Sequence, residues 1–354
     1  MTALPILQFI AALAALIVVH ELGHFFAAKL SGIKIQEFGI GFPPRLVRLF
    51  RAGETDFTLN WIPLGGFVRP AGENDPKVPG GLAASSPWTR IFVLASGPAM
   101  NILAALLIFV FIFMQLGKPD LTTVQIMDVS AGSPAAGAGL RTGDIVLKVN
   151  DVEVNSTEQL RNEIYAHLGE TIAITYQRDG AVNTASLIPR DPPPADGAIG
   201  IAMGNPRVPI TFGESVVFSV QAIGEQVNAL VTLPGRLLSG EVSPDQGRLV
   251  GYKGMYDLYS EVREADASLE SQVPPGINTL AFFASISISL GLLNLLPVPA
   301  LDGGRILFTL PEILFRRRIP ATYENVVNLV GLALLFILIF YVNIQDFLNP
   351  VVFP

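Results

Sequence analysis

The sequence contains no cysteine and only three histidines among its 354 residues. Without cysteine the protein has no disulfides, no thiolate metal ligands and no thiol nucleophile. Charged residues make up 15% of the chain, against about a quarter in soluble domains. The net charge of −7 also argues against nucleic-acid binding, which requires a basic surface. Because 50% of the residues are hydrophobic, the composition is typical of a membrane protein.

Four stretches are long and apolar enough to cross a bilayer, which takes about 20 residues of helix. We predict membrane-spanning helices at Pro5–Lys29, Ile91–Leu116, Ile277–Leu296 and Val326–Val342. The first stretch has no Lys or Arg before Lys29, so it lacks the basic segment that begins a signal peptide. We therefore expect a mainly α-helical polytopic membrane protein with four transmembrane helices.

The distribution of Lys and Arg predicts how these helices are oriented, because cytoplasmic loops are enriched in both residues. Residues 1–28 and 319–354 contain neither, whereas 29–90 and the short segment after the third span contain many. Both termini and the segment 117–275 are therefore expected outside the cytoplasm. The segment 117–275 is rich in acidic residues, and long domains are translocated largely regardless of charge.

The segment 122–204 has the pattern of a small α+β domain. Short runs of β-forming residues are separated by Gly, Asp, Asn and Pro, and 156–167 is the main predicted helix. The run Gly-Leu-Arg-Thr-Gly-Asp at 139–144 resembles the hallmark of bacterial PDZ domains, and Ile-Gly-Ile at 199–201 resembles their carboxylate-binding loop. Such domains bind peptides by adding a strand to a sheet edge; the alternative is a generic β-rich domain. The strands are predicted at Val124–Val129, Ile145–Val149, Thr171–Gln177 and Ala185–Pro189.

Residues 205–275 are interpreted as an amphipathic and linking region. Ile210–Leu238 is mildly amphipathic and is expected to lie on the membrane surface. Residues 239–275 are polar and acidic, and we expect them to be irregular. The membrane core is then divided into residues 1–121, with two spans, and residues 276–354, with the other two.

An H-E-x-x-H motif, formed by His20, Glu21 and His24, follows the first apolar run. On a helix, residues four apart share a face, so both imidazoles can bind one zinc ion while the glutamate acts on water. The alternative is a polar helix end at the membrane interface. Ionisable groups are costly in a membrane, which favours a functional site.

A catalytic zinc site takes three protein ligands and one open position. His167 belongs to the insert, across the membrane from the motif, and is expected to be an ordinary surface histidine. Asp302 follows the third span and is predicted at the cytoplasmic face, as are His20 and His24. We therefore predict Asp302 as the third ligand, although an aspartate before two glycines also suits a helix cap.

These motifs resemble the site-2 protease family of intramembrane zinc metalloproteases, and especially the bacterial branch containing the regulator of sigma-E protease. The H-E-x-G-H motif, Gly-Pro-x-x-Asn at 97–101 and N-x-x-P-x-x-x-L-D-G at 294–303 occur in the family's order. Ile-Gly-Phe-Pro at 40–43 and Pro-Leu-Gly-Gly at 63–66 are similar to its membrane-reentrant β-hairpin. The similarity covers nearly the whole chain and includes one PDZ domain, but 247–254 departs from the element usual before the third span.

The resemblance implies a protease of the bacterial inner membrane that cuts within or beside transmembrane segments, as in regulated proteolysis of anti-sigma factors or signal-peptide remnants. It implies zinc bound by His20, His24 and Asp302, with Glu21 as general base and then acid.

The resemblance also concerns substrate contacts. It implies that Asn294 contacts the substrate backbone or the developing oxyanion. Gly65 and Gly66 would permit close approach of an extended substrate, or alternatively form a simple turn. The expected partners are single-span membrane proteins, intact or already cut by another protease, and a peptide or C-terminus bound by the PDZ domain.

Two roles are open for the insert, which is expected either to filter substrates by size or to dock them. Two other functions explain part of the sequence. A membrane scaffold presenting a PDZ domain leaves the three ligand-type residues unexplained, and a transporter is disfavoured because inverted repeats are not detectable.

Overall fold

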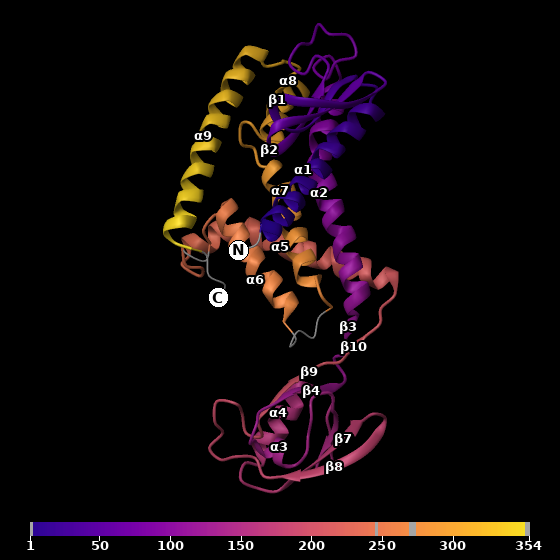
Figure 1. Ribbon diagram of the computed structural model, residues 1–354, viewed down its shortest axis with the longest axis vertical. Coiled ribbons are helices and arrows are strands. Elements are labelled where there is room, and N and C mark those ends of the chain that lie inside the picture. The colour runs from indigo at the N-terminus through magenta and orange to yellow at the C-terminus, as the bar shows by residue number, and fades with distance from the viewer. Residues whose placement is uncertain (1–2, 245–246, 269–273, 351–354) are drawn as a thin grey trace. The chain divides into compact units, whose positions relative to one another are not determined.

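The structure, a computed structural model, describes residues 3–244, 247–268 and 274–350 (Figure 1). The chain divides into two compact units. The first unit contains Met1–Ile112 and Phe212–Pro354, and the second contains Phe113–Thr211.

Helices dominate the first unit. Among the described residues, five helices, α1, α2, α5, α7 and α9, are long and apolar enough to cross a membrane. Each of the four predicted spans coincides with one of these five, although the third was predicted to end two residues beyond α7, and α5 is the additional helix. The helices are α1 Ala3–Leu30, α2 Pro87–Leu116, α5 Phe212–Leu238, α6 Tyr252–Ala267, α7 Ile277–Asn294, α8 Asp302–Phe315 and α9 Ala321–Leu348.

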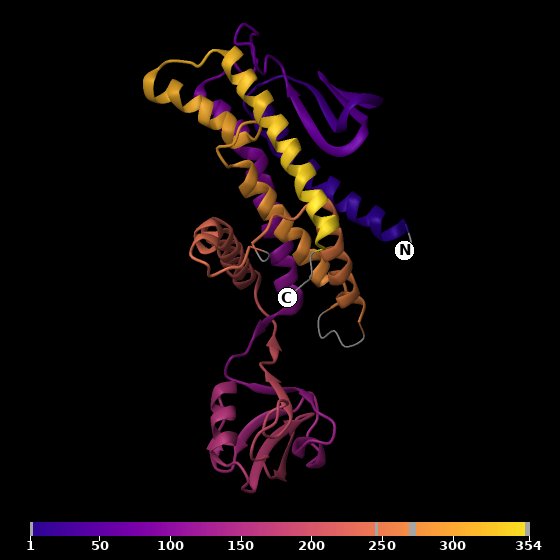
Figure 2. The same ribbon diagram turned by 90° about the vertical axis from the view of Figure 1, so that its left-hand side faces the viewer.

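The additional helix, α5, differs from the other four. Its mean hydropathy of 1.3 is the lowest of the five. It runs across the direction of α2 and α7 rather than along it, as both views show (Figures 1 and 2). It contacts α7 through Gln226, whose Nε2 donates to the Ser285 carbonyl at 2.9 Å. Length and composition alone therefore do not distinguish a crossing helix from one that lies along the membrane surface.

The helix α6 contradicts the expectation that 239–275 is irregular. Tyr256 and Tyr259 lie on one face of it, and their rings pack against Phe9 of α1, with centroids 5.6 and 5.5 Å away. Tyr256 and Tyr259, three residues apart, thus pack α6 against α1 although the overall composition of the segment is polar.

Small residues let α2 approach both α1 and α7 closely. A Cβ atom at Gly23 of α1 would lie 2.2 Å from the Ser96 carbonyl oxygen of α2. Ala105 of α2 and Ala284 of α7 are completely buried in a shared cluster with Ile288. Lipid tails are as apolar as these side chains, so close van der Waals packing drives such helix association.

Two bent strands, β1 (Ile35–Ala52) and β2 (Thr55–Pro70), pair antiparallel beside α1. The first half of β1 lies between the two halves of β2, and the second half of β1 pairs with the first half of β2. Within the described chain, the second half of β2 is therefore an edge of this sheet. The register passes through Ile35↔Pro70, Ile40↔Gly66, Glu37↔Asp56, Phe42↔Ile62, Arg45↔Asn60 and Ala52↔Thr55.

The apolar face of this sheet rests on α1. Phe38 and Phe57 stack with ring centroids 5.5 Å apart, and both contact Phe25 of α1 at 5.7 and 5.8 Å. These aromatic contacts fix the sheet against the helix that carries the H-E-x-x-H motif.

The second unit is a small α+β domain with the strand order β8-β7-β5-β4-β9, in which β6 pairs with β5. Its main helix α4, Thr157–Ala166, begins after Ser156, whose side chain accepts a hydrogen bond from the Gln159 backbone. Two of its strands, β4 and β5, have the predicted bounds, while the later two are shifted. The strands are β4 Val124–Val129, β5 Ile145–Val149, β6 Val152–Glu153, β7 Ile172–Arg178, β8 Ala181–Leu187 and β9 Ile201–Gly204.

The core of this unit lies between α4 and the sheet. Leu160 and Ile164 of α4 are buried in one hydrophobic cluster with Ile126, Ile172 and Ile174 of the strands. The short helix α3, Pro134–Gly137, is capped by Ser133, which accepts a hydrogen bond from the Ala136 backbone. Two short strands, β3 (Lys118–Pro119) and β10 (Arg207–Val208), pair where the chain enters and leaves the unit.

Candidate metal centre

The helix α1 places His20 and His24 one turn apart on the same face, as the spacing predicts. Their Nε2 atoms are 3.2 Å apart. Their rings lie edge to face with centroids 4.8 Å apart. Both side chains are largely buried, with 11% and 13% of their surface exposed. Two imidazole nitrogens from one helix thus face the same point.

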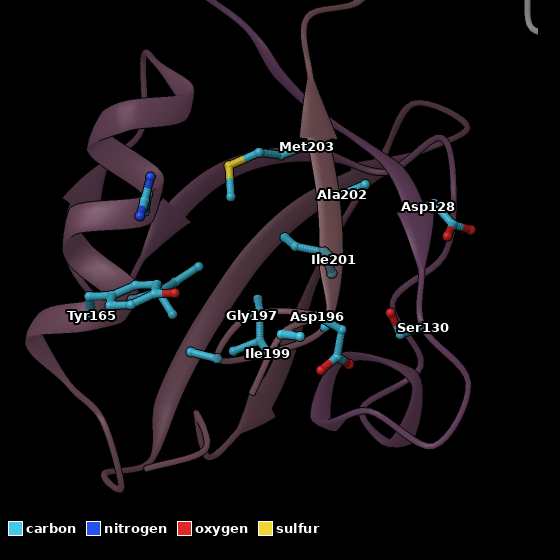
Figure 3. A pocket seen from close by; sticks show the side chains of 14 residues that line it. Asp128, Ser130, Tyr165, Asp196, Gly197, Ile199, Ile201, Ala202 and Met203 are labelled. Carbon is cyan, nitrogen blue, oxygen red and sulfur yellow. The ribbon is translucent and has the colours of Figure 1, made fainter. Parts of the chain in front are cut away.

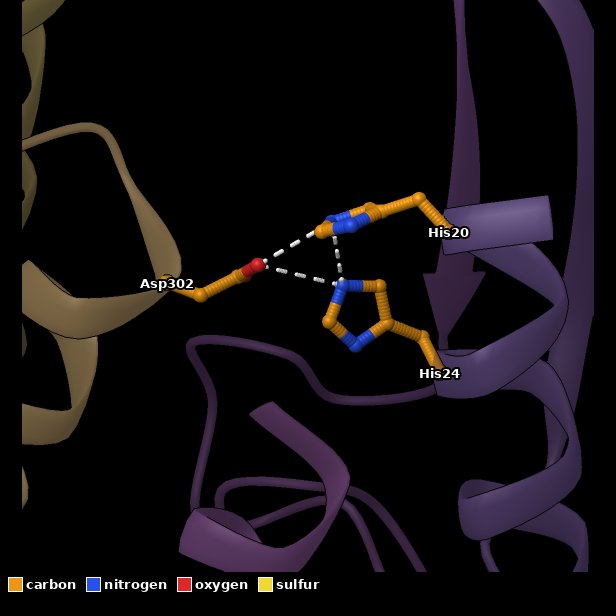
Figure 4. A group of neighbouring side chains, drawn as sticks. All are labelled: His20, His24 and Asp302. Carbon is orange, nitrogen blue, oxygen red and sulfur yellow. Dashed lines mark hydrogen bonds and ion pairs between the residues drawn. The ribbon is translucent and has the colours of Figure 1, made fainter. Parts of the chain in front are cut away.

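Asp302, the first residue of α8, brings its carboxylate to this point (Figure 4). Its Oδ2 lies 3.1 Å from His20 Nε2 and 3.3 Å from His24 Nε2. The three side chains can each offer one ligand atom within 4.8 Å of the others, and no other such group occurs among the described residues. The fold therefore joins residues that are 282 positions apart in sequence.

Two glycines support the position of Asp302. Added Cβ atoms at Gly303 and Gly304 would each lie 2.2 Å from a backbone carbonyl oxygen of the segment 295–298. This segment between α7 and α8 therefore packs directly on the start of α8, which only glycine allows. The N-cap position is occupied by Leu301, so Asp302 belongs to the first turn of α8 and is not its cap.

The helix α2 forms a wall behind the two histidines. His24 Nδ1 lies 2.8 Å from the Val93 carbonyl oxygen. Because a carbonyl only accepts, Nδ1 carries the ring proton and Nε2 keeps its lone pair for the shared point. A Cβ atom at Gly97 would lie 2.4 Å from His24 Nε2 and 2.8 Å from His20 Nε2. Any side chain at this position would displace the imidazoles.

The three donor atoms fit a zinc ion. Two imidazoles with one carboxylate form a common ligand set of catalytic zinc sites, which leave a fourth position open. Ligand atoms about 2.0–2.1 Å from zinc in a tetrahedron lie about 3.3 Å from one another. The three distances here are 3.1, 3.2 and 3.3 Å. Both the chemistry and the spacing of the donors thus suit this metal.

The glycine pair of β2 has two different environments. A Cβ atom at Gly66 would lie 3.1 Å from Glu21 Cγ, so the edge of the sheet borders the glutamate of the motif. A Cβ atom at Gly65 would instead meet the Phe42 ring at 2.4 Å. Gly65 also has φ +100°, a backbone conformation that favours glycine. Of the two, Gly66 is the residue beside the H-E-x-x-H motif.

Two other residues considered from the sequence lie outside the three-residue group. Asn294 ends α7, and its Nδ2 donates to the Leu290 carbonyl at 3.0 Å, one turn back on the same helix. His167 belongs to the second unit, where its ring nitrogens lie 3.3 Å from Glu163 and 3.0 Å from Glu170.

Sequence reasoning alone did not assign Val93, Gly97 or Asn101 to the site, although the family resemblance includes the run 97–101. These residues are four apart, so they share one face of α2. Asn101 Nδ2 lies 3.4 Å from His20 Nδ1. The signal present in the sequence was a glycine and an asparagine four residues apart in an otherwise apolar helix.

Known proteins resemble this chain over most of its length. Residues 8–338 match peptidase family M50. A predicted zinc metalloprotease of Clostridium perfringens is 32% identical over 342 residues, and the match covers 96% of this chain and 97% of the relative's length. Zinc metalloprotease RasP of Shouchella clausii is 27% identical over 431 residues, covering 96% and 98%. A solved PDZ domain of an SdrC-like protein from Listeria monocytogenes covers 24% of this chain and 92% of its own, with 23% identity and a TM-score of 0.21.

Apolar helices around an H-E-x-x-H motif and a distant aspartate define a membrane metalloenzyme. The family match and the relatives show which kind: the chain is a zinc metalloprotease with several membrane helices. It belongs to peptidase family M50, the site-2 proteases.

Proposed function

We propose that this enzyme hydrolyses peptide bonds within or next to the transmembrane segments of membrane proteins, in regulated proteolysis. His20, His24 and Asp302 hold the zinc, and Glu21 moves the proton. The observation that carries this proposal is the convergence of three donor atoms from α1 and α8 beside helices apolar enough to span a membrane. Zinc bound there would polarise the scissile carbonyl and lower the pKa of water to about 7.

Glu21 follows directly after His20 on α1, and Gly66 leaves the space beside its side chain open. Its carboxylate takes a proton from the water that attacks the scissile carbonyl, and it returns that proton to the leaving amine. A positioned carboxylate can do both because the base of the first step becomes the acid of the second.

Substrate presentation follows from the edge of the small sheet. A peptide bond in a transmembrane helix is shielded by the helix, so the substrate must become extended before it is cut. The second half of β2 is an edge strand, and its Gly66 borders Glu21. An extended substrate added to this edge would pass the glutamate, with its backbone held by the sheet. We assign Asn294, at the end of α7, to the same substrate backbone or to the oxyanion.

The direction of the helices supports four spans. His20 and His24 lie in the second half of α1, and Asp302 directly follows the loop after α7, yet all three meet. α1 and α7 therefore run the same way across the bilayer, which requires an odd number of crossings between them. α2 supplies one crossing between α1 and α7. If α5 also crossed, there would be two crossings, and α1 and α7 would run in opposite directions. We therefore propose that α5 lies along the membrane surface.

The charge pattern then orients the protein. The loop 29–90 and the arginines around α8 are rich in positive charge, so they face the cytoplasm. The termini and the second unit lie on the other side, and the zinc site lies toward the cytoplasmic face. Because the relatives named above are bacterial, we assign the protein to the cell membrane of a bacterium, which is the inner membrane where the cell has two.

The second unit is proposed to act as a PDZ domain on extracytoplasmic peptides. In its sheet β9 is the last strand, and a groove of about 430 Å³ lies between β9 and α4 (Figure 3). Ile199, Ile201 and Met203 line it on one side and Tyr165 of α4 on the other. An open strand edge beside an apolar groove suits a bound peptide or C-terminus, whether the unit docks substrates or filters them by size.

The test is cleavage of a single-span membrane substrate by the purified enzyme in lipid nanodiscs. We expect cleavage within or beside the span, located by mass spectrometry, with loss on chelation and recovery with added zinc. Stoichiometric zinc should be lost in His20→Ala. Zinc binding without any cleavage would favour a metal-binding scaffold or transporter. Cleavage only in soluble segments far from the span would contradict the proposed substrate class.

A further inference from the structure

Asn101 of α2 is almost completely buried, with 1% of its surface exposed, directly behind His20. Its Nδ2 lies 3.4 Å from His20 Nδ1. Its Oδ1 is buried, and it has no hydrogen-bond partner among the described residues. A buried polar atom without a partner destabilises the folded protein, so this arrangement calls for an explanation.

The proton on His20 decides how the amide must be oriented. A neutral imidazole carries one proton, so a ring that offers its Nε2 lone pair to zinc carries that proton on Nδ1. The Nδ1–H group is then a donor and needs an acceptor. The Asn101 Nδ2 group is itself a donor and cannot accept this hydrogen bond, whereas the unpartnered Oδ1 of Asn101 can accept it. Rotating the amide by half a turn exchanges these two atoms and leaves the shape of the side chain unchanged.

We propose that Asn101 is a positioning residue of the zinc site, whose Oδ1 accepts a hydrogen bond from His20 Nδ1–H. This fixes the tautomer and the orientation of the ring, with Nε2 toward His24 and Asp302. The inference rests on the proposed function, since it takes His20 as a zinc ligand.

The second histidine is held in the same manner. His24 Nδ1 donates to the Val93 carbonyl, two helical turns from Asn101 on α2. Gly97 lies midway and leaves space for both rings. One face of α2 therefore presents an acceptor to each histidine, one from the backbone and one from a side chain. The backbone carbonyl of Asn101 also accepts a hydrogen bond from Ser287 Oγ of α7 at 2.9 Å, which is a packing contact between the two helices.

The direct test is nitrogen-15 NMR of the full-length zinc enzyme labelled at histidine, which has only three histidines. His167 is recognised by the loss of its signals in His167→Gln. Both remaining rings should show a protonated Nδ1 and a metal-bound Nε2. A remaining ring whose Nδ1 carries no proton would overturn the inference, and this readout needs no variant at Asn101.

The second test is zinc affinity. Asn101→Leu keeps the volume but removes the acceptor, so the dissociation constant should rise by about 10–100-fold. Asn101→Asp keeps an acceptor and should stay within about threefold of wild type. Ser287→Ala, the control for packing between α2 and α7, should also stay within about threefold. Zinc affinity unchanged in Asn101→Leu, or lost equally in Asn101→Asp or Ser287→Ala, would contradict the inference.

Failure of this inference is distinguishable from failure of the proposed function. If His20→Ala keeps stoichiometric zinc, the ligand assignment itself is wrong. If His20→Ala loses zinc while Asn101→Leu binds it normally, only the role of Asn101 is wrong.

Discussion

Histidines lie beside carboxylates in two regions of this chain, and the two clusters have opposite character. In the first unit, His20 and His24 direct their Nε2 atoms toward one oxygen of Asp302, and none of the three side chains is more than 14% exposed. In the second unit, His167 ends α4 with a different carboxylate near each ring nitrogen, at 3.3 and 3.0 Å, and 33% of its side chain is exposed.

The comparison shows what makes a histidine a candidate metal ligand. Around Asp302 three lone pairs converge, because α2 binds the far nitrogen of His24 through Val93. At His167 each nitrogen faces its own glutamate, so the donor atoms share no common point. Water and salt also screen the exposed cluster, which leaves its ion pairs weak. The same residue types therefore indicate chemistry in one region and ordinary surface contacts in the other.

The largest expected difference between the two regions appears when one carboxylate is removed from each. Glu21→Gln keeps the size of the side chain but cannot move a proton, so cleavage should fall by at least about a hundredfold, with zinc still bound. Glu163→Gln removes a carboxylate one turn from His167 and should leave the rate unchanged. Cleavage rates of the reconstituted enzyme with zinc analysis measure both. A Glu21→Gln rate above about a tenth of wild type would exclude Glu21 as the proton shuttle.

The second prediction exchanges a carboxylate for an amide at the metal. Asp302→Asn should lose both zinc and activity, because a neutral amide is a poor zinc ligand. His167→Asn, the matched change in the other cluster, should keep both. Elemental analysis of the dialysed proteins decides the question. If Asp302→Asn retains full zinc and activity, the third ligand lies elsewhere, and His167 is the next histidine to examine.

The third prediction concerns the space behind the two ligand histidines. A Cβ atom at Gly97 would lie within 2.8 Å of both Nε2 atoms, so Gly97→Ala should weaken zinc binding by at least about tenfold. Gly224→Ala in α5 is the control, since an added Cβ there meets no atom within 4 Å and should have no effect on zinc. Competition with a metal-binding dye measures the affinities. Normal affinity in Gly97→Ala would show that α1 and α2 can separate without disturbing the rings.

The sequence predicts contacts between residues of one helix more readily than contacts between residues of different helices, and this site contains both kinds. The pair His20 and His24 follows from spacing on a single helix. Asp302 required a further argument, from the charge of the loops, that placed it at the same face of the membrane. The roles of Gly97 and Asn101 depend on which face α2 turns toward α1, and the pattern of an apolar helix does not specify that face.

The helix α6 illustrates the same limit for the fold. Asp346 of α9 is completely buried and accepts hydrogen bonds from the Gly251 and Gly254 backbone nitrogens at 2.7 and 2.9 Å. These contacts cap the start of α6 from a residue that is 95 positions away in sequence. The polar composition of this segment predicted an irregular structure. The prediction was wrong because the carboxylate that caps α6 belongs to another helix and is not visible in the local sequence.

The fourth prediction separates what the two regions do to a substrate. If the second unit filters substrates by size, deleting 122–204 should leave zinc bound and reduce the preference for a pre-trimmed substrate over an intact one. The β3–β10 pair holds residues 118–119 next to 207–208, so a short link can replace the deleted segment. Values of kcat/KM for both substrate forms give the preference. An unchanged preference would exclude the filter, and loss of all cleavage with zinc retained would favour docking.

The smallest expected effect is a shift in the titration of His167. Glu170, which accepts a hydrogen bond from the ring, and Glu163 raise the pKa of His167 above its usual value. A raised pKa in the folded state stabilises the protein at low pH, and this contribution is lost as the pH rises through the folded-state pKa. We expect Glu170→Gln to lower the titration midpoint of His167, which nitrogen-15 NMR measures. Zinc binding and cleavage should be unchanged. The effect on stability should be small, because solvent screens an exposed pair. If Glu170→Gln does not move the midpoint, this carboxylate does not tune the ring. If it changes zinc binding, the two histidine clusters are not independent.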